Sequence, residues 1–285
     1  MSIRLRAGTP EDATECGDIC YRAFRVIAEK HNFPPDFPSS QVVTTFLSES
    51  LAHPDIYGVV AELDGRIVGS NFVDERSIIA GIGPITVDPD VQDRAIGREL
   101  MLHVMDRVAN RRFPGVRLVQ AAYHNRSLSL YTKLGFAARE PLSTIQGKPI
   151  AVKIPGYIVR PADVGDLSAC NQVCMRVHGH NRGGEVHDAI MRGTATVVEH
   201  NGRITGYATA IGFLGHAVGE TNEELKALIG AAPEFLGPGF LLPTRNAELF
   251  RWCLEQGLRV VQPMTLMSIG LYNEPAGAFL ASVLY

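Results

Sequence analysis

The sequence predicts an α/β protein with mixed sheets, built as two copies of one domain in tandem. Strand-like and helix-like segments alternate along the first 150 residues, which is typical of α/β domains. A pattern of polar and cysteine residues then recurs in the second half of the 285-residue chain, which indicates an internal repeat. We therefore predict domains over 1–150 and 156–285, each a twisted mixed sheet flanked by helices.

Local patterns predict the elements of the first copy in order. Alternating residues predict a strand, and apolar residues at helical spacing predict the long helix after it. Two β-rich runs around Asp64-Gly65 predict a hairpin, and Gly135 is a helix-ending glycine. The expected elements are a strand at 2–6, a helix at 12–29, a hairpin at 59–73, a strand at 77–87, a helix from about 97 to 110, a strand at 116–123 and a short helix at 126–135.

The repeat is specific enough to align the two halves. The segment ELDGRIVGS at 62–70 recurs 137 positions later as EHNGRITGY at 199–207, and a looser match joins 129–141 to 251–263 at an offset of 122. The first copy therefore has 15 extra residues between these two segments. Four further residues recur 154 positions later, namely Arg6, Asp12, Cys16 and Cys20 as Arg160, Asp166, Cys170 and Cys174.

Composition argues against several classes of partner. The net charge is −3 with basic residues scattered singly, so we expect neither nucleic acid nor an anionic membrane as a partner. No apolar run approaches the roughly 20 residues that span a bilayer, and the first residues lack the apolar core of a signal peptide. Five cysteines without paired-ligand spacing indicate reduced thiols and a cytoplasmic protein.

The extra residues of the first copy include VDPDVQDRAIGREL at 87–100. A strand, a turn of small residues and a helix N-terminus form the geometry that binds phosphate, because the first N–H groups of a helix lack internal partners. Small residues at Ala95 and Gly97 would let a pyrophosphate approach closely, although an ordinary strand-to-helix turn also fits. The second copy instead has a capping box at Thr221 to Glu224, whose carboxylates would repel such an anion.

Two motifs in the first copy carry a resemblance to a known family. The pattern Gln92-x-x-Ala95-x-Gly97 resembles motif A of the GNAT N-acetyltransferase superfamily, Gln/Arg-x-x-Gly-x-Gly/Ala, with Ala95 at the first Gly. The segment NRSLSLYTKLGF at 125–136 is similar to the family's next motif, in which a helix carries a Tyr four residues before a Gly-Phe pair. Residues 157–285 resemble the second, degenerate domain of some two-domain bacterial members.

The resemblance implies acetyl-CoA as the co-substrate of the first domain. Its pantetheine arm would add to the strand before the turn through backbone hydrogen bonds, and its pyrophosphate would lie on the N–H groups of residues 92–98. Asn125 takes the role of an Asn that the family has one position earlier, where this sequence has His124. The implied binding residues are Ile85, Thr86, Val87, Gln92, Asp93, Arg94, Ala95, Ile96, Gly97, Arg98, Asn125, Ser127 and Tyr131.

Acetyl transfer to an amine needs a proton donor for the leaving thiolate and a base for the amine. The resemblance assigns the donor to Tyr131, whose other interpretation is a half-buried helix tyrosine. The backbone N–H near Val87 would polarise the thioester carbonyl. Asp74 and Glu75, directly after the hairpin, are candidates for the base, and a solvated turn explains them equally well.

The segment HGHNRGGEVHD at 178–188 raises two further possibilities. His178, His180 and His187 match no common zinc spacing and have no cysteine nearby, so we predict no metal. The resemblance places this segment on the acceptor side, so His178, Arg182 and Glu185 are candidate substrate ligands, although its composition favours a solvated loop. The proline-rich run at 31–40 is either a wall of the acceptor site or a surface loop.

The sequence thus predicts an acetyl-CoA-dependent N-acetyltransferase in which an amine attacks the thioester directly. The acceptor is a small-molecule or peptide amine, and a homodimer is compatible with the sequence. The alternative is a non-catalytic GNAT-like protein that binds CoA or another ligand in a regulatory role. Turnover with amines that depends on Tyr131 distinguishes the two.

Overall fold

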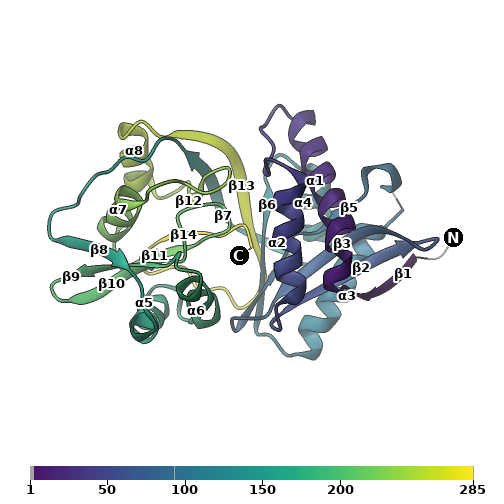
Figure 1. Ribbon diagram of the computed structural model, residues 1–285, viewed down its shortest axis with the longest axis horizontal. Coiled ribbons are helices and arrows are strands. Elements are labelled where there is room, and N and C mark those ends of the chain that lie inside the picture. The colour runs from purple at the N-terminus through teal and green to yellow at the C-terminus, as the bar shows by residue number, and fades with distance from the viewer. Residues whose placement is uncertain (1–2, 93, 285) are drawn as a thin grey trace.

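The computed structural model describes residues 3–92 and 94–284. It consists of two α/β units side by side, each with helices packed on a twisted sheet (Figure 1). The larger sheet is mixed, because β4 and β6 run parallel, whereas the strand pairs of the smaller sheet are all antiparallel. The predicted fold class is therefore confirmed.

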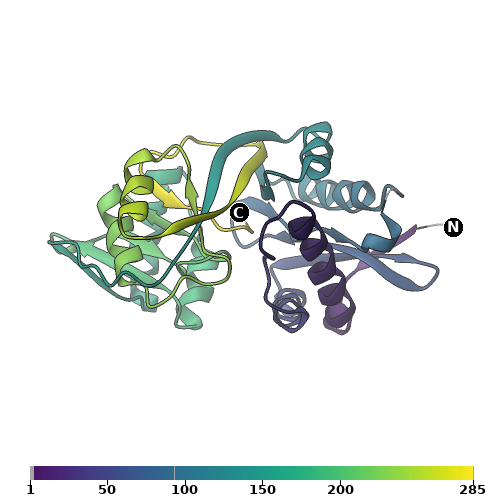
Figure 2. The same ribbon diagram turned by 90° about the horizontal axis from the view of Figure 1, so that it is seen from above.

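In the first unit, α1 and α2 cover one face of the sheet, and α3 and α4 cover the other (Figure 2). Each pair of helices buries an apolar face against the strands, and this burial of apolar surface stabilises the layered arrangement. The helices are α1 (Ala13–Lys30), α2 (Ser40–Ala52), α3 (Ile96–Asn110) and α4 (Asn125–Lys133). The strands are β1 (Ile3–Ala7), β2 (Ile56–Leu63), β3 (Arg66–Asp74), β4 (Ile79–Ile82), β5 (Thr86–Val87), β6 (Gly115–Ala121) and β7 (Ala137–Gln146).

The second unit repeats this order but lacks a counterpart of β5. The strand β11 leads after two residues into α7, which begins with the predicted capping box of Thr221 and Glu224. The helices are α5 (Leu167–His178), α6 (Gly183–Met191), α7 (Asn222–Ala231) and α8 (Ala247–Glu255). The strands are β8 (Tyr157–Pro161), β9 (Thr196–His200), β10 (Arg203–Ala208), β11 (Ala217–Gly219), β12 (Phe240–Pro243), β13 (Arg259–Gly270) and β14 (Ala278–Leu280).

The repeated polar residues make the same clamp in both halves. The Arg6 guanidinium lies 2.7 Å from both Asp12 and Glu62. Arg160 lies 2.6 Å from Asp166, and its Nε donates to Glu199 at 2.8 Å. Each arginine ties the first strand of its unit to the start of the first helix and to the next strand. The repeat seen in the sequence is therefore a repeat of contacts as well.

The two units share one sheet. Among the described residues the larger sheet has nine strands, with β5 paired to β3 and the others in the order β1-β2-β3-β4-β6-β13-β7-β12. The strand β13 of the second half thus lies between β6 and β7 of the first, antiparallel to both. The larger sheet thus combines strands from both sides of the predicted domain boundary near residue 150 (Figure 1).

The structure departs from the sequence-based expectations in three segments. The helix α2 follows the proline-rich run and was not predicted, and its N-terminus is capped by the Ser39 hydroxyl, which accepts from the Val42 N–H. The expected strand at 77–87 is interrupted at residues 83–85 and becomes β4 and β5. The solvated loop expected at 178–188 is wrong, because His178, His180 and Arg182 are buried and the residues from Gly183 onward form α6.

The cysteines pack in the core, as their spacing along the helices indicates. All five lie within the described residues, are buried and form no disulfide. Burial raises the pKa of Cys16 and of Cys170 to about 12, so both stay protonated and unreactive near neutral pH.

Candidate active site

The site lies where two neighbouring strands of the larger sheet separate. The strand β4 pairs with β6 in parallel only from Ile79 to Gly81. The chain then turns away, and β5 pairs with β3 alone. Residues 82–87 and 118–121 line opposite sides of the gap, which belongs to a cavity of about 500 Å³. The edge of β5 that faces β6 is therefore open to an added extended chain.

The turn before α3 borders this cavity with unshielded backbone. Ala95 precedes the helix in the left-handed conformation at φ 61°, and the helix begins at Ile96, so its first N–H groups have no intrahelical partner. A Cβ added at Gly97 would meet only Val87 Cγ2 at 3.7 Å and Leu130 Cδ2 at 3.9 Å. The space beside Gly97 is thus open. The Arg126 guanidinium, which donates to Gln92 at 3.4 Å, brings positive charge to the same turn.

Most of the predicted cofactor residues line this cavity. Arg94 and Asn125 do not line it, and Asp93 lies outside the described residues. The remaining ones all line it, namely Ile85, Thr86, Val87, Gln92, Ala95, Ile96, Gly97, Arg98, Ser127 and Tyr131.

Tyr131 lies on α4 with its side chain on the cavity wall. It is 6% exposed, and its ring contacts Phe136 edge-on at 6.1 Å between centroids. Burial raises the pKa of the Tyr131 phenol above its ordinary value. The hydroxyl therefore stays protonated near neutral pH and can serve as a proton donor.

A buried amide on β6 offers a hydrogen-bond donor in the same region. Gln120 lines the cavity and is 5% exposed. Its Oε1 accepts from the Ser127 hydroxyl at 2.9 Å, whereas its Nε2 has no partner within residues 3–92 and 94–284. A buried donor without a partner costs free energy, so a bound carbonyl oxygen would be stabilised here.

Asp36 is a site residue that sequence reasoning missed. It lies in the proline-rich run between α1 and α2, is 7% exposed and lines the cavity. Burial raises the pKa of its carboxyl to about 6, and the Gln262 Nε2, which donates to it at 2.7 Å, opposes that rise. A carboxylate with a pKa near neutrality is suited to act as a general base. The run at 31–40 is thus a wall of the cavity, one of the two roles that its sequence allows.

Contacts from both halves of the chain hold Asp36 in place. The ring of Tyr123 stacks on Phe33 at 4.2 Å, which fixes the proline-rich run. The Tyr123 hydroxyl donates to the Oε1 of Gln262 at 3.2 Å. Gln262 lies on β13, so a residue of the second half orients the carboxylate of the first.

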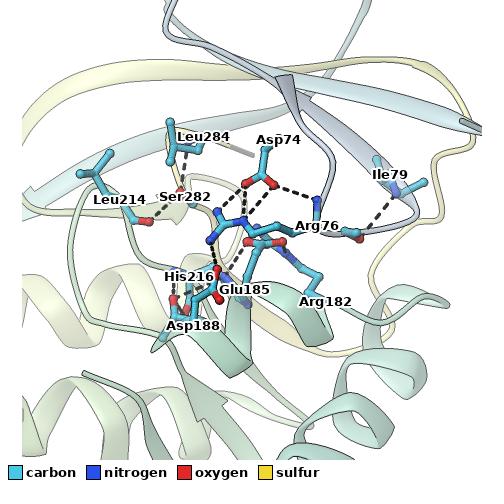
Figure 3. A network of polar contacts seen from close by, with 12 residues as sticks. Asp74, Arg76, Ile79, Arg182, Glu185, Asp188, Leu214, His216, Ser282 and Leu284 are labelled. Atoms are coloured by element: carbon cyan, nitrogen blue, oxygen red, sulfur yellow. Dashed lines mark hydrogen bonds and ion pairs between the residues drawn. The ribbon is translucent and has the colours of Figure 1, made fainter. Parts of the chain in front are cut away.

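The second half also supplies part of the cavity wall. Phe213, Leu214, Met264, Val283 and Leu284 line it. The Ser282 hydroxyl donates to the Leu214 carbonyl at 3.0 Å and accepts from the Leu284 N–H at 3.1 Å (Figure 3). This hydroxyl ties the C-terminal segment to the loop that carries Leu214.

Asp74 and Glu75, the predicted candidates for the base, lie outside the cavity lining. Asp74 is paired with Arg76, which follows it by two residues. The Glu75 side chain is 4% exposed and lies 2.6 Å from Arg107 and 2.8 Å from Arg111. Both carboxylates are engaged in ion pairs and lie outside the cavity, so neither is placed to act as the base there.

The candidate substrate residues of the second half also lie away from the cavity. His178 and Arg182 are buried, and the Glu185 side chain is 10% exposed. The Arg182 Nε donates to Glu185 at 2.8 Å, and the Glu185 carboxylate lies 3.4 Å from the His216 ring (Figure 3). Burial lowers the pKa of His216 to about 4, so in this contact the neutral His216 ring donates a hydrogen bond to the Glu185 carboxylate.

The same network joins the two units. The Arg76 guanidinium, in the first unit, lies between two carboxylates, Asp74 of the same unit and Asp188 of the second unit. It donates to Asp188 at 2.8 Å (Figure 3). The His53 ring contacts the same Asp188 oxygen at 3.1 Å. These contacts fix how the second unit is placed against the cavity.

Two other properties of the described residues bear on the chemistry. Within 3–92 and 94–284, no three His, Cys, Asp or Glu side chains gather so that they could hold a metal ion. In the same part of the chain, no helix is long and apolar enough to cross a membrane.

Residues 23–136 match the Acetyltransferase (GNAT) family. No curated protein matches the chain.

Three solved structures share the fold over nearly the whole length. A putative acetyltransferase from Pyrococcus horikoshii is 18% identical, with 97% of this chain and 94% of that chain covered and a TM-score of 0.76. A GCN5-related N-acetyltransferase from Sphaerobacter thermophilus is 16% identical, with coverage of 95% and 96% and a TM-score of 0.62. A tandem GNAT protein from the clavulanic acid biosynthesis pathway is 13% identical, with coverage of 94% and 98% and a TM-score of 0.58.

Proposed function

We propose that this chain is a two-domain member of the GNAT superfamily and an acetyl-CoA-dependent N-acetyltransferase, with its active site in the cavity of about 500 Å³ between β5 and β6. The observation that carries the proposal is that one cavity brings together the open strand edge, the exposed start of α3, Tyr131 and Asp36. These are the parts that acetyl transfer to an amine requires.

The residues present fit acetyl-CoA. The open edge of β5 at Thr86 and Val87 would take the pantetheine arm by strand addition. The N–H groups at the start of α3 would take the pyrophosphate, with space provided beside Gly97 and positive charge from Arg98 and Arg126. Bound acetyl-CoA would supply the acetyl group as a thioester.

Tyr131 and Asp36 then have complementary tasks. The amine nitrogen forms the new C–N bond to the acetyl carbon, and the C–S bond breaks. Asp36 accepts the proton that the nitrogen loses, and Tyr131 donates its proton to the leaving sulfur. The Val87 N–H would stabilise the oxyanion of the addition step.

Release of free thiol from acetyl-CoA, followed with a panel of amines, tests this function. We expect Tyr131→Phe and Asp36→Asn each to lower kcat about 10²-fold, the usual contribution of one proton-transfer group. Tyr57→Phe is the matched control, because the Tyr57 hydroxyl bonds to His103 and lies outside the cavity lining. It should leave kcat unchanged.

Two outcomes would contradict the proposal. Full activity of Tyr131→Phe would remove the tyrosine from the mechanism. Binding of acetyl-CoA without turnover of any amine would instead favour a regulatory CoA-binding protein.

A further inference from the structure

The cavity is apolar on the side where Asp36 lies. Phe24 comes from α1, Phe37 follows Asp36 directly, and Phe46 comes from α2. The rings of Phe24 and Phe37 meet edge-on at 5.9 Å between centroids. The second unit adds Phe213, which is 3% exposed. A ligand body that contacts these side chains would be stabilised by loss of apolar surface from water.

The charges of the lining are divided between two regions. Asp36 is the only carboxylate among the described lining residues. The arginines of the lining, Arg98 and Arg126, belong to the starts of α3 and α4, and Arg126 bonds to Gln92 of the phosphate turn. Burial lowers the pKa of His124 to about 4, so this lining ring is neutral. The region around Asp36 therefore attracts a positively charged group of a ligand, and it provides no positive charge to pair with a carboxylate of a ligand.

The region around Asp36 is less suited to acetyl acceptors with additional polar or charged groups. A peptide brings several backbone N–H and C=O groups that need partners when buried. The Gln120 Nε2 offers one donor to a carbonyl, whereas the Tyr123 hydroxyl already donates to Gln262. A polyamine brings a second ammonium group, and no second carboxylate lines the cavity within the described residues. An amino acid brings a carboxylate that Asp36 repels.

Resting on the acetyl transfer proposed above, we propose that the acceptor is a small primary amine with an apolar, preferably aromatic, body and no carboxylate. Asp36 binds its nitrogen and takes the proton released on acetylation. The aromatic side chains of both units enclose its body.

The test measures kcat/KM of the full chain at saturating acetyl-CoA for four acceptors. They are 2-phenylethylamine, phenylalanine, spermidine and a tripeptide with N-terminal phenylalanine. The first two differ only by the carboxylate, and the tripeptide adds backbone amides to the same ring. We expect kcat/KM for 2-phenylethylamine to exceed that of each other acceptor by about 30-fold or more. This ratio corresponds to burying one aromatic ring relative to spermidine, to avoiding one like-charge contact relative to phenylalanine, and to avoiding unpaired buried peptide groups relative to the tripeptide.

A charge placed on the wall makes the test specific to the cavity. Leu214 lines the cavity and is 41% exposed, so Leu214→Arg should fold. It should reduce the preference for 2-phenylethylamine over phenylalanine by about 10-fold, because the new cation repels the amine and attracts the carboxylate. Leu254 is 43% exposed on α8 and outside the lining, so Leu254→Arg is the matched control and should keep the preference.

The outcomes separate this inference from the function on which it rests. Turnover of phenylalanine, spermidine or the tripeptide at or above that of 2-phenylethylamine would overturn the acceptor class and leave acetyl transfer intact. An unchanged preference in Leu214→Arg would overturn the role of this wall. Absence of turnover with all four acceptors and across the wider amine panel would overturn both proposals.

Discussion

At the scale of single residues, the buried carboxyl of Asp36, which we propose as the general base, also lowers the stability of the fold. Its carboxyl is buried, and this raises its pKa to about 6. The folded protein therefore holds this proton more tightly than the unfolded chain does. As pH rises from about 4 to about 6, the unfolded chain releases the proton first, and the fold loses stability through this group.

We expect Asp36→Asn to raise the free energy of unfolding at pH 7.5 by about 2 kcal/mol, because it removes a buried charge and keeps an acceptor oxygen for Gln262. The difference from wild type should vanish as the pH approaches 4. Urea denaturation across this range measures it. Asp106→Asn, at an exposed position of α3, is the control and should change stability by less than about 0.5 kcal/mol. A less stable Asp36→Asn at pH 7.5 would contradict this account of Asp36.

The site residues proposed from contiguous motifs lie close together in the structure, although they are separated in the sequence. Gln92, Gly97 and Tyr131 belong to two such motifs, and all line the cavity. Asp36 could not be predicted in this way, because its burial and its bond to Gln262 depend on a residue 226 positions away. Its position in a proline-rich run that only the first copy has was the available signal.

At the scale of elements, the turn before α3 carries the departure from the family pattern. Ala95 takes the position where the pattern has Gly, and its φ of 61° lies in the left-handed region. This conformation costs an alanine free energy because its Cβ approaches the backbone. The left-handed turn explains why Gly is common at this position.

We expect Ala95→Gly to stabilise the fold by up to about 1 kcal/mol, since relief of the left-handed strain exceeds the extra flexibility of glycine in the unfolded chain. Thermal or urea unfolding measures the change. Ala109→Gly, near the other end of the same helix, should instead destabilise by about 1 kcal/mol. A destabilised Ala95→Gly would mean that the turn differs from the one described.

Element boundaries were least predictable where tertiary contacts decide them. The strand expected at 77–87 is broken at residues 83–85. Before the break, β4 pairs with β6, and after it, β5 pairs with β3 but not with β6. The helix α2 was missed because the prolines before it suggested a loop. The segment at 178–188 looked solvated, yet His180 is 1% exposed at the junction of the units.

At the scale of the whole molecule, the second unit forms part of the cavity that we propose as the active site. The strand β13 lies between β6 and β7 and carries both Gln262 and Met264 to the cavity. The sequence revealed the repeat but not this exchange of strands, because strand pairing between distant segments leaves no local pattern. The second copy, which lacks the turn proposed to bind phosphate, thus contributes to the cavity by lining it and by orienting Asp36.

The pH dependence of kcat/KM should report this contribution. Gln262 stabilises the Asp36 carboxylate through its hydrogen bond. We expect kcat/KM to fall as pH falls through about 6, because Asp36 is then protonated. In Gln262→Met this midpoint should move up by about 1 pH unit, since a hydrogen bond to a charged group is lost. A profile that does not move would show that Gln262 does not tune the base.

The measurement that tests the central claim most directly is a calorimetric titration of acetyl-CoA into the intact chain and into Gly97→Glu. The open space beside Gly97 lets the fold accept the substitution, while the added carboxylate occupies the proposed pyrophosphate position. Ala109→Glu places the same charge at the far, exposed end of α3 and serves as the control. We predict one-to-one binding by the wild type and by Ala109→Glu, and its loss in Gly97→Glu with circular dichroism unchanged. Equal binding by all three proteins would contradict the proposed site, and no binding by any would contradict acetyl transfer itself.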